Sequence, residues 1–145
     1  MKILVTGGAG FIGSHVADAY LARGHQVVIV DDLSGGSRDN LNPKAKFYQA
    51  DIRGDQIEGI FQREHFDVVN HHAAQMDVRR SVADPKFDAS VNVMGSLNLL
   101  ESVRKNGVKK IIFASTGGAI YGEQESFPAT ESHPQRPLSP YGITK

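Results

Sequence analysis

The sequence contains no cysteine, so neither a disulfide framework nor a thiolate site can be built from it. It also lacks a surplus of either charge, because 16 basic and 16 acidic residues give a formal net charge of zero. No apolar run approaches the roughly 18 residues that a membrane-spanning helix needs. The first apolar run is too short, and too soon interrupted by glycine, to be a signal peptide. These absences favour a soluble cytoplasmic protein with neither nucleic acid nor membrane as a partner.

What the chain does contain, within the length of one domain, is an alternation of strand-like and helix-like segments. Strand patterns occupy residues 2–6, 26–30, 46–50, 67–73 and 109–114. Helical patterns lie at 11–23, 55–65 and 86–106, while glycine and proline make 116–140 a loop. Such alternation predicts an α/β fold of the Rossmann type, a doubly wound parallel sheet covered on both faces. Ligands of such sheets bind beyond the carboxyl ends of the strands.

Apolar residues recur at helical spacing in two of these segments, which predicts amphipathic helices. In 11–23 they are Phe11, Ile12, Val16, Ala19 and Tyr20, and in 86–106 they are Phe87, Val91, Met94, Leu97, Leu100 and Val103.

The first strand leads into a glycine-rich turn. Gly7, Gly10 and Gly13 follow the spacing G-x-x-G-x-x-G between a strand and a helix. In a dinucleotide-binding turn, the first glycine permits the sharp bend and the second lets the backbone approach a pyrophosphate. The third lets the helix pack closely on the strand. Free amides of the first helical turn, at Phe11 and Ile12, would add hydrogen bonds and partial positive charge. The alternative is a tight turn without a ligand.

Acidic residues end the second and third strands. Asp31, followed by Asp32, lies 18 residues past Gly13, where a carboxylate would hydrogen-bond the hydroxyls of an adenosine ribose. Its charge would repel a 2′-phosphate, which favours NAD over NADP. Asp51, followed by Ile52, could reach the adenine or could cap the following helix, and the sequence leaves both interpretations open.

Five motifs in order give the chain a resemblance to the extended short-chain dehydrogenase/reductases: the glycine turn, Asp31-Asp32-Leu33, Asp51-Ile52, His72-Ala73-Ala74-Gln75 and Tyr141-x-x-x-Lys145. Within that family it looks most like the NAD-dependent nucleotide-sugar epimerases, the 4-epimerases of UDP-hexoses in particular. The resemblance implies NAD as cofactor, a nucleotide sugar as partner and epimerisation at C4 through a 4-keto intermediate, which is isomerase chemistry. It also implies that the cofactor is bordered by His72, Ala73, Ala74, Asn92, Tyr141 and Lys145.

Tyr141 and Lys145 are four residues apart, so a helix would place them on one face. A phenol normally titrates at about pH 10, but a neighbouring ammonium and the positive nicotinamide ring would favour phenolate and make Tyr141 a general base. The family pattern implies that Lys145 also holds the nicotinamide ribose. A catalytic hydroxyl should follow the fifth strand, and counting forward from Phe113 assigns it to Thr116, with Ser115 as the alternative.

Several positions depart from related enzymes or have a second interpretation. Related 4,6-dehydratases carry an Asp-Glu pair where this chain has Gly117-Gly118, which argues against dehydration. Met76 stands where some epimerases have a lysine, and Arg79-Arg80, expected in a loop, could face the sugar-nucleotide diphosphate or solvent. His71 and His72 would point to opposite faces of a strand, so we expect His71 to be packed and no metal to be bound.

The resemblance further implies that residues 1–145 are an incomplete NAD-binding domain. Family members continue for a similar length, with the last strands of the sheet and a smaller substrate domain. We therefore expect a fragment that is inactive alone, and whose last helix is too short to be stable by itself. The family also implies a homodimer at full length, with residues 86–106 as a candidate interface. The alternatives are a UDP-glucuronate epimerase or decarboxylase, and a non-catalytic NAD-binding module.

Overall fold

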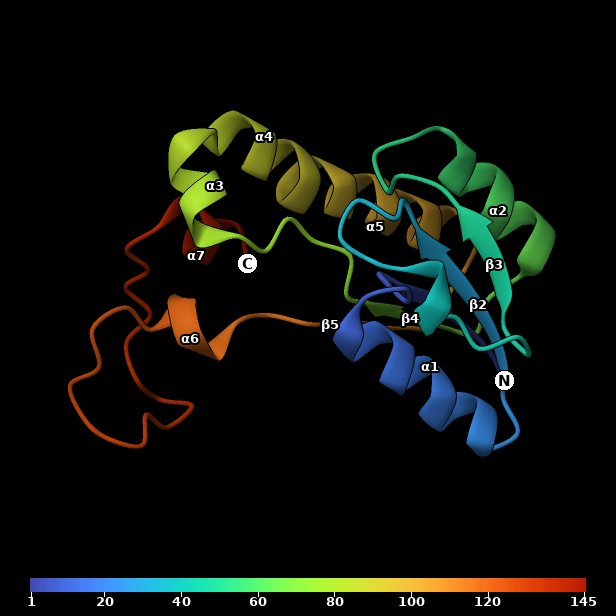
Figure 1. Cartoon of the computed structure of the whole chain (residues 1–145), viewed down its shortest axis with the longest axis horizontal. Helices are drawn as coiled ribbons and strands as arrows, with labels where there is room; N and C mark the ends of the chain where they lie inside the picture. Colours follow the sequence, from blue (N-terminus) through green and yellow to red (C-terminus); the bar gives the residue numbers. More distant parts are fainter.

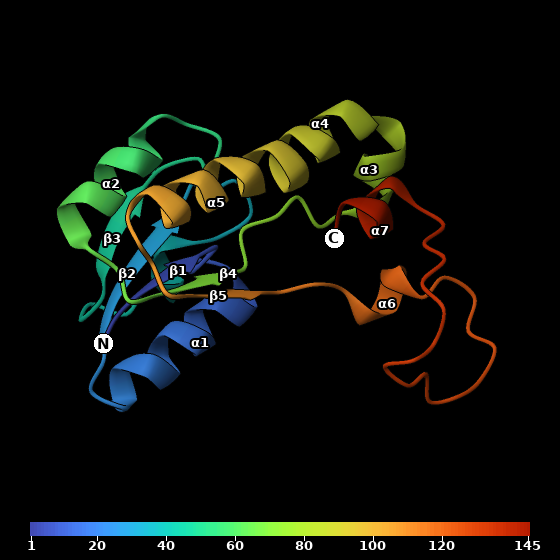
Figure 2. The same cartoon turned by 180° about the vertical axis from the view of Figure 1, so that it is seen from behind.

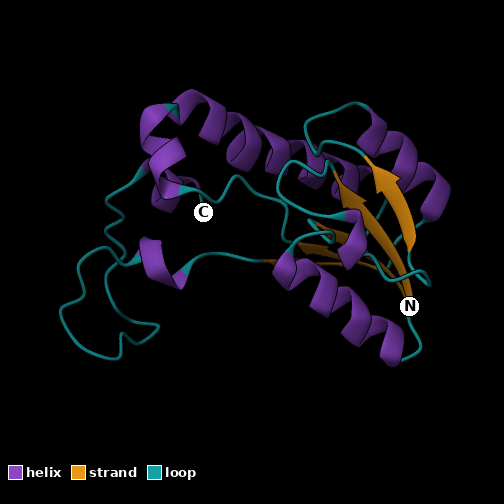
Figure 3. Ribbon diagram, viewed as in Figure 1, coloured by secondary structure: helices purple, strands orange, loops and turns teal.

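The computed structural model describes residues 1–145, and its centre is a parallel five-stranded sheet (Figures 1 and 3). The strands are β1 Lys2–Thr6, β2 Gln26–Asp31, β3 Lys46–Gln49, β4 Val68–His71 and β5 Lys110–Phe113. They lie in the order β3-β2-β1-β4-β5, and every neighbouring pair is parallel. The strands after β1 are added first on one side of it (β2, β3) and then on the other (β4, β5). The strand order therefore reverses between β1 and β4, and such folds bind their ligands at this point.

Helices cover both faces of the sheet, as the doubly wound fold predicts (Figures 1 and 2). On one face, α1 (Phe11–Ala22) packs through Ala17 against Ile3, Val5 and Ile29. On the other, α2 (Gln56–Glu64) and α5 (Ser96–Lys105) enclose a larger cluster. Its buried members are Leu4, Val28, Val30, Ala50, Ile57, Ile60, Phe61, Phe66, Val69 and Leu99. The predicted fold class and all five strands are confirmed.

The helix predicted over residues 86–106 forms as one continuous rod in three parts. Asp84 caps α4 (Pro85–Ala89) by accepting a hydrogen bond from the amide of Phe87 at 3.0 Å. A π-helical turn, η2 (Ser90–Gly95), then leads into α5. The residues that this rod buries are mostly polar or small: Asp88, Asn92, Gly95, Leu99 and Ser102.

The predicted apolar sides of two helices face the sheet only in part: Tyr20 and Val103 pack against the core clusters, but other members are exposed. On α1, Phe11 and Ile12 are 79% and 64% exposed, while Gly13, Ser14 and Ala17 are buried. On the rod, the apolar residues Met94, Leu97 and Leu100 are exposed, and Gly95 lies against Ile52. A Cβ atom on Gly95 would come within 2.7 Å of the Ile52 side chain, so only a small residue permits this approach.

Three short helices form where the sequence showed no helical periodicity. These are η1 (Arg38–Asn40), α3 (Val78–Ala83) and α6 (Gly117–Ile120). The side chain of Asp77 begins α3 by accepting hydrogen bonds from the amides of Arg79 and Arg80. β4 correspondingly ends at His71, two residues before the predicted end. None of the helices is both long enough and apolar enough to span a membrane.

Beyond β5 the chain leaves the sheet, runs through α6 and a long loop, and returns as α7 (Pro140–Thr144) (Figure 2). α7 packs against α3 and α4, which lie far earlier in the sequence, and also against the preceding helix α6. Inside the loop, His133 accepts a hydrogen bond from the amide of Glu125 at 3.0 Å and packs edge-on against Tyr121.

Candidate functional site

A cleft of about 340 Å³ opens at the carboxyl ends of the strands. It is bordered by the turns that follow β1, β2, β3 and β4, and on its far side by α3, α4 and η2. Predicted cofactor residues that line it are Gly7, Gly10, Asp31, Asp32, Asp51, Ile52, His72, Ala73 and Ala74. Residues from four loops, spread over more than 60 positions of sequence, therefore meet in one place.

The glycine turn has the geometry that its spacing predicts. Gly7 has φ 68°, and a Cβ atom there would lie 2.6 Å from the backbone nitrogen of Ala73. A Cβ atom on Gly13 would lie only 2.2 Å from the carbonyl oxygen of Gly7, so Gly13 allows α1 to start directly against the turn. Phe11 and Ile12 open α1, where backbone amides have no intrahelical acceptor. The turn therefore offers donors to a ligand seated over Gly10.

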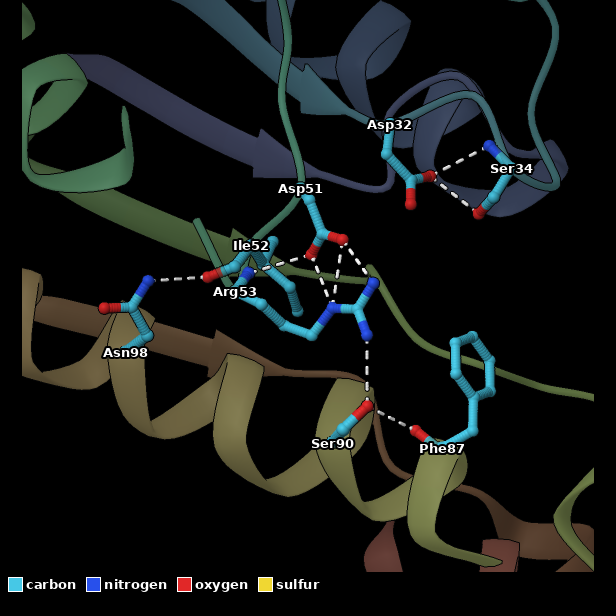
Figure 4. Close-up of polar contacts among 8 residues, drawn as sticks. All are labelled: Asp32, Ser34, Asp51, Ile52, Arg53, Phe87, Ser90 and Asn98. Atoms are coloured by element: carbon cyan, nitrogen blue, oxygen red, sulfur yellow. Dashed lines mark hydrogen bonds and ion pairs between the residues drawn. The ribbon is translucent and has the colours of Figure 1, made fainter. Parts of the chain in front are cut away.

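Asp31 holds the two loops around the turn together. Its carboxylate accepts hydrogen bonds from the amides of Ala9 at 3.0 Å and Leu33 at 2.8 Å, and only 7% of the residue is exposed. Each carboxylate oxygen has two lone pairs, so this bracing leaves acceptor capacity for a ligand in the cleft. Asp32 instead accepts from both the amide and the hydroxyl of Ser34, at 2.9 and 2.6 Å (Figure 4).

Asp51 forms an ion pair across the cleft wall. Arg53 donates to both its carboxylate oxygens, and this hydrogen bonding lowers the pKa of Asp51 (Figure 4). The same guanidinium donates to the hydroxyl of Ser90 on η2 at 3.1 Å. The capping interpretation of Asp51 is wrong, because the residue at the N-cap position of α2 is Asp55. Sequence reasoning missed Arg53, because no local pattern showed which carboxylate it would pair with.

The adjoining wall contains a stack that the sequence did not reveal. Arg80, which belongs to α3 and not to a loop, lies 3.9 Å from the ring centre of Phe87, and Arg53 lies 5.5 Å from the same ring. Phe87 is thus flanked by two guanidinium groups, a favourable electrostatic arrangement. Arg53, Arg80 and Phe87 all line the cleft.

His71 and His72 have different surroundings, as their positions on a strand predict. His71 is buried, with Nδ1 2.6 Å from the Thr6 hydroxyl and Nε2 3.0 Å from that of Ser96. Burial lowers the pKa of His71 to about 4, so the ring is neutral and packed. His72 lines the cleft, and its Nε2 has no hydrogen-bond partner. Burial lowers the pKa of His72, and the charge of Lys145 lowers it further.

The predicted catalytic residues do not line the cleft themselves. The ammonium of Lys145 is 4.6 Å from the ring centre of Phe113, and burial lowers its pKa. Ser115 donates its hydroxyl to the carbonyl oxygen of Lys145 at 2.8 Å, whereas the hydroxyl of Thr116 has no partner within the chain. Of the two candidate hydroxyls, Thr116 is therefore the free one. Tyr141 is half-buried on α7, one turn before Lys145.

Asn92 lies beneath the cleft wall and does not line it. Its Oδ1 accepts from the amide of Gln75 at 2.8 Å, and its Nδ2 donates to the carbonyl of Gln75 at 3.0 Å. The same nitrogen lies within 3.2 Å of Asp88 and 3.1 Å of Thr144. Because both polar atoms of its amide bond to other residues of the chain, Asn92 supports the wall from beneath, and its contact with a cofactor stays a prediction.

Comparison with known proteins gives a consistent set of matches. The profile of the NAD dependent epimerase/dehydratase family matches residues 3–145. A UDP-glucose 4-epimerase of Mycolicibacterium smegmatis is 45% identical over 150 residues, which cover 100% of this chain and 48% of the relative. The chain thus spans about half the length of the curated relatives it matches.

Solved structures show the same likeness. The crystal structure of a Thermotoga maritima UDP-glucose 4-epimerase with UDP-glucose superposes with a TM-score of 0.97 at 52% identity, over 100% of this chain and 48% of that one. The UDP-glucose 4-epimerase of Thermus thermophilus, in complex with NAD, gives a TM-score of 0.96 at 49% identity, over 100% and 47% of the two chains.

Proposed function

The chain belongs to the NAD-dependent epimerase/dehydratase family, and from that premise we propose that it is the NAD-binding part of a nucleotide-sugar 4-epimerase acting on a UDP-hexose. One observation carries the proposal. The helix α7, which carries Tyr141 and leads into Lys145, packs against α3 and α4, and these two helices contribute Arg80 and Phe87 to the wall of the glycine-turn cleft. The proposed acid–base pair is thus attached to the same wall that borders the proposed dinucleotide cleft.

The residues of the cleft fit a dinucleotide. A pyrophosphate would lie over Gly10, against the free amides of Phe11 and Ile12. Asp31 and Asp32 would face an adenosine ribose, and their charge disfavours a 2′-phosphate. The buried, unpaired Nε2 of His72 is a polar atom that a ligand could satisfy. NAD, when bound, would supply the oxidation and re-reduction of the sugar carbon.

The chain's own residues would handle the proton and the orientation of the sugar. Tyr141, as phenolate, would accept the proton of the C4 hydroxyl. It would return the proton after the 4-keto sugar has rotated to present its opposite face. The ammonium of Lys145 would favour that phenolate by its charge. The free hydroxyl of Thr116 would donate a hydrogen bond to the sugar oxygen. Because oxidation is followed by its reversal, no external oxidant is needed.

The turn after β5 supports epimerisation over dehydration. Elimination of water needs an acid and a base next to the sugar ring, and here the corresponding positions are Gly117 and Gly118 in α6. Neither residue can transfer a proton through a side chain.

The experiment that tests the function uses the protein at its natural full length. We expect it to convert UDP-glucose into UDP-galactose with no added NAD, because the cofactor is regenerated at each turnover. Stoichiometric NAD without conversion would instead favour a different nucleotide sugar, such as UDP-glucuronate, or a non-catalytic module. Absence of bound NAD would contradict the proposal.

We also propose that the full-length protein is a homodimer formed through the rod. Its apolar stripe, Val93, Met94, Leu97 and Leu100, is 39–61% exposed, and a contiguous exposed stripe of this kind marks an interaction surface. Leu97→Glu should shift sedimentation from dimer to monomer. Val82→Glu, at an equally apolar and exposed position on α3, is the control that should leave the dimer intact.

A further inference from the structure

A carboxylate with no cationic partner is buried where α4, α3 and α7 meet. Asp88 on α4 has no measurable exposure and forms no ion pair. Its donors are Gln75 Nε2 at 2.9 Å and Asn92 Nδ2 at 3.2 Å on one oxygen, and Thr144 Oγ1 at 2.7 Å on the other. The two N–H groups of Asn92 are shared among Asp88, Gln75 and Thr144, so Gln75 and Thr144 are the principal donors to Asp88. Burying a carboxylate is costly, so each of these bonds is needed to hold it.

The three donors come from different parts of the candidate site. Gln75 lines the cleft at the end of β4, and its amide group also bonds both backbone polar atoms of Asp77. Thr144 belongs to α7, between Tyr141 and Lys145. Asp88 therefore connects the wall of the cleft with the helix that carries the proposed base.

The direction of the hydrogen bonds fixes the hydroxyl of Thr144. The hydroxyl oxygen accepts a hydrogen bond from Asn92 at 3.1 Å. Its proton has two possible acceptors, Asp88 at 2.7 Å and the carbonyl oxygen of Tyr141 at 3.2 Å. The bond to Asp88 is the shorter of the two and is charge-assisted, so the hydroxyl donates to Asp88. A shift of α7 would break this bond and leave a buried carboxylate oxygen unpaired.

We propose that Asp88 is a positioning residue for the proton transfer: through Thr144 it holds Tyr141 and Lys145 in place against the cleft. This proposal rests on the proposed function, because positioning Tyr141 and Lys145 matters for proton transfer only if those residues are catalytic. Asp88 itself touches neither cleft nor base, and it acts through the hydroxyl of Thr144.

The test compares Thr144→Val, which keeps the shape but removes the hydroxyl, with Thr144→Ser, which keeps the hydroxyl. Both are made in the full-length protein, with Thr130→Val as the control at an exposed threonine. For Thr144→Val we expect the backbone amides of residues 141–145 to exchange with solvent about tenfold faster, while exchange in the strands is unchanged. We also expect kcat to fall about 10- to 100-fold, at unchanged KM and NAD content. Thr144→Ser should restore most of both values.

Asp88→Ala is the second variant, in case Thr144→Val does not fold. Alanine offers no acceptor to Thr144, Gln75 or Asn92, so the amides of residues 141–145 should again exchange faster. Wild-type exchange and wild-type kcat in either folded variant would overturn the proposal, as would a loss that Thr144→Ser does not rescue. If the wild-type protein shows no epimerase turnover, the proposed function fails, and the exchange data alone still decide whether Asp88 holds α7.

Discussion

The sheet body, residues 1–113, and the segment that follows it, residues 114–145, are held in place by different interactions. All 18 buried apolar side chains lie between Ile3 and Leu99. In the later segment the buried residues are His133 and Gly142. Its side-chain attachment to the body is polar: Thr144 donates to Asp88 and accepts from Asn92. The dinucleotide cleft is thus built on an apolar core, and the proposed base is placed by hydrogen bonds.

This difference separates binding from catalysis. Apolar burial contributes about 25 cal/mol per Å² and is not directional, so the body can form its cleft whatever happens to α7. Hydrogen bonds contribute less to net stability but require a particular geometry. We therefore expect changes in the body to act on folding and on NAD binding, and changes in the segment to act on turnover.

The largest expected effect separates the two regions directly. Tyr141→Phe in the full-length protein should lower kcat about 10²- to 10⁴-fold, because it removes the general base while retaining the ring. The NAD content, measured after denaturation of the purified protein, should stay at the wild-type value. A loss of NAD together with activity would show that the two regions are not separable in this way.

A smaller effect is expected from two glycine substitutions in the body. Gly13→Ala should cost about 1–3 kcal/mol of unfolding free energy, because the new methyl group would lie 2.2 Å from the Gly7 carbonyl. Gly59→Ala is the matched control in α2, where a Cβ atom meets nothing within 4 Å, and it should stabilise by about 0.5–1 kcal/mol. Denaturant unfolding measures both, and equal effects at the two sites would contradict the close packing at the turn.

The last comparison applies the same substitution, Glu to Gln, at two sites, and one of these has the smallest expected effect. Burial opposes ionisation of Glu64, but hydrogen bonds from Lys2, Lys46 and Tyr48 prevail and lower its pKa from 4.5 to about 2. Glu64→Gln should therefore cost about 1–3 kcal/mol near neutral pH. Glu125→Gln breaks a pair with Arg136 whose side chains are 60% and 70% exposed, and it should cost less than about 0.5 kcal/mol.

The pH dependence gives a second test of Glu64. Because its pKa is lower in the folded than in the unfolded protein, its contribution is complete above about pH 4.5 and is lost as the pH falls towards 2. The unfolding free energy of Glu64→Gln should lose this part of its pH dependence, whereas Glu125→Gln should titrate like the wild type. Parallel curves for all three proteins would contradict the assignment.

The sheet could be predicted from the sequence because buried parallel strands are continuous apolar runs, as in Val27–Val30. The orientation of the helices could not. The apolar residues Phe11 and Leu97 are exposed, while the small residues Gly13 and Gly95 lie against neighbouring backbone and side chains. Hydrophobic periodicity does not report how closely a helix approaches its neighbour, and at these two positions the close approach decides the packing.

The sequence by itself determined the parallel sheet, the glycine turn and the order of the motifs along the chain, because these depend on local periodicity and on the backbone freedom of single residues. Only the tertiary structure decided that Arg53 reaches Ser90, that Asn92 lies beneath the cleft, and that Asp88 holds Thr144 from 56 positions away. Such contacts depend on which segments the packed core brings together, and buried polar groups then bond whatever partner lies within reach.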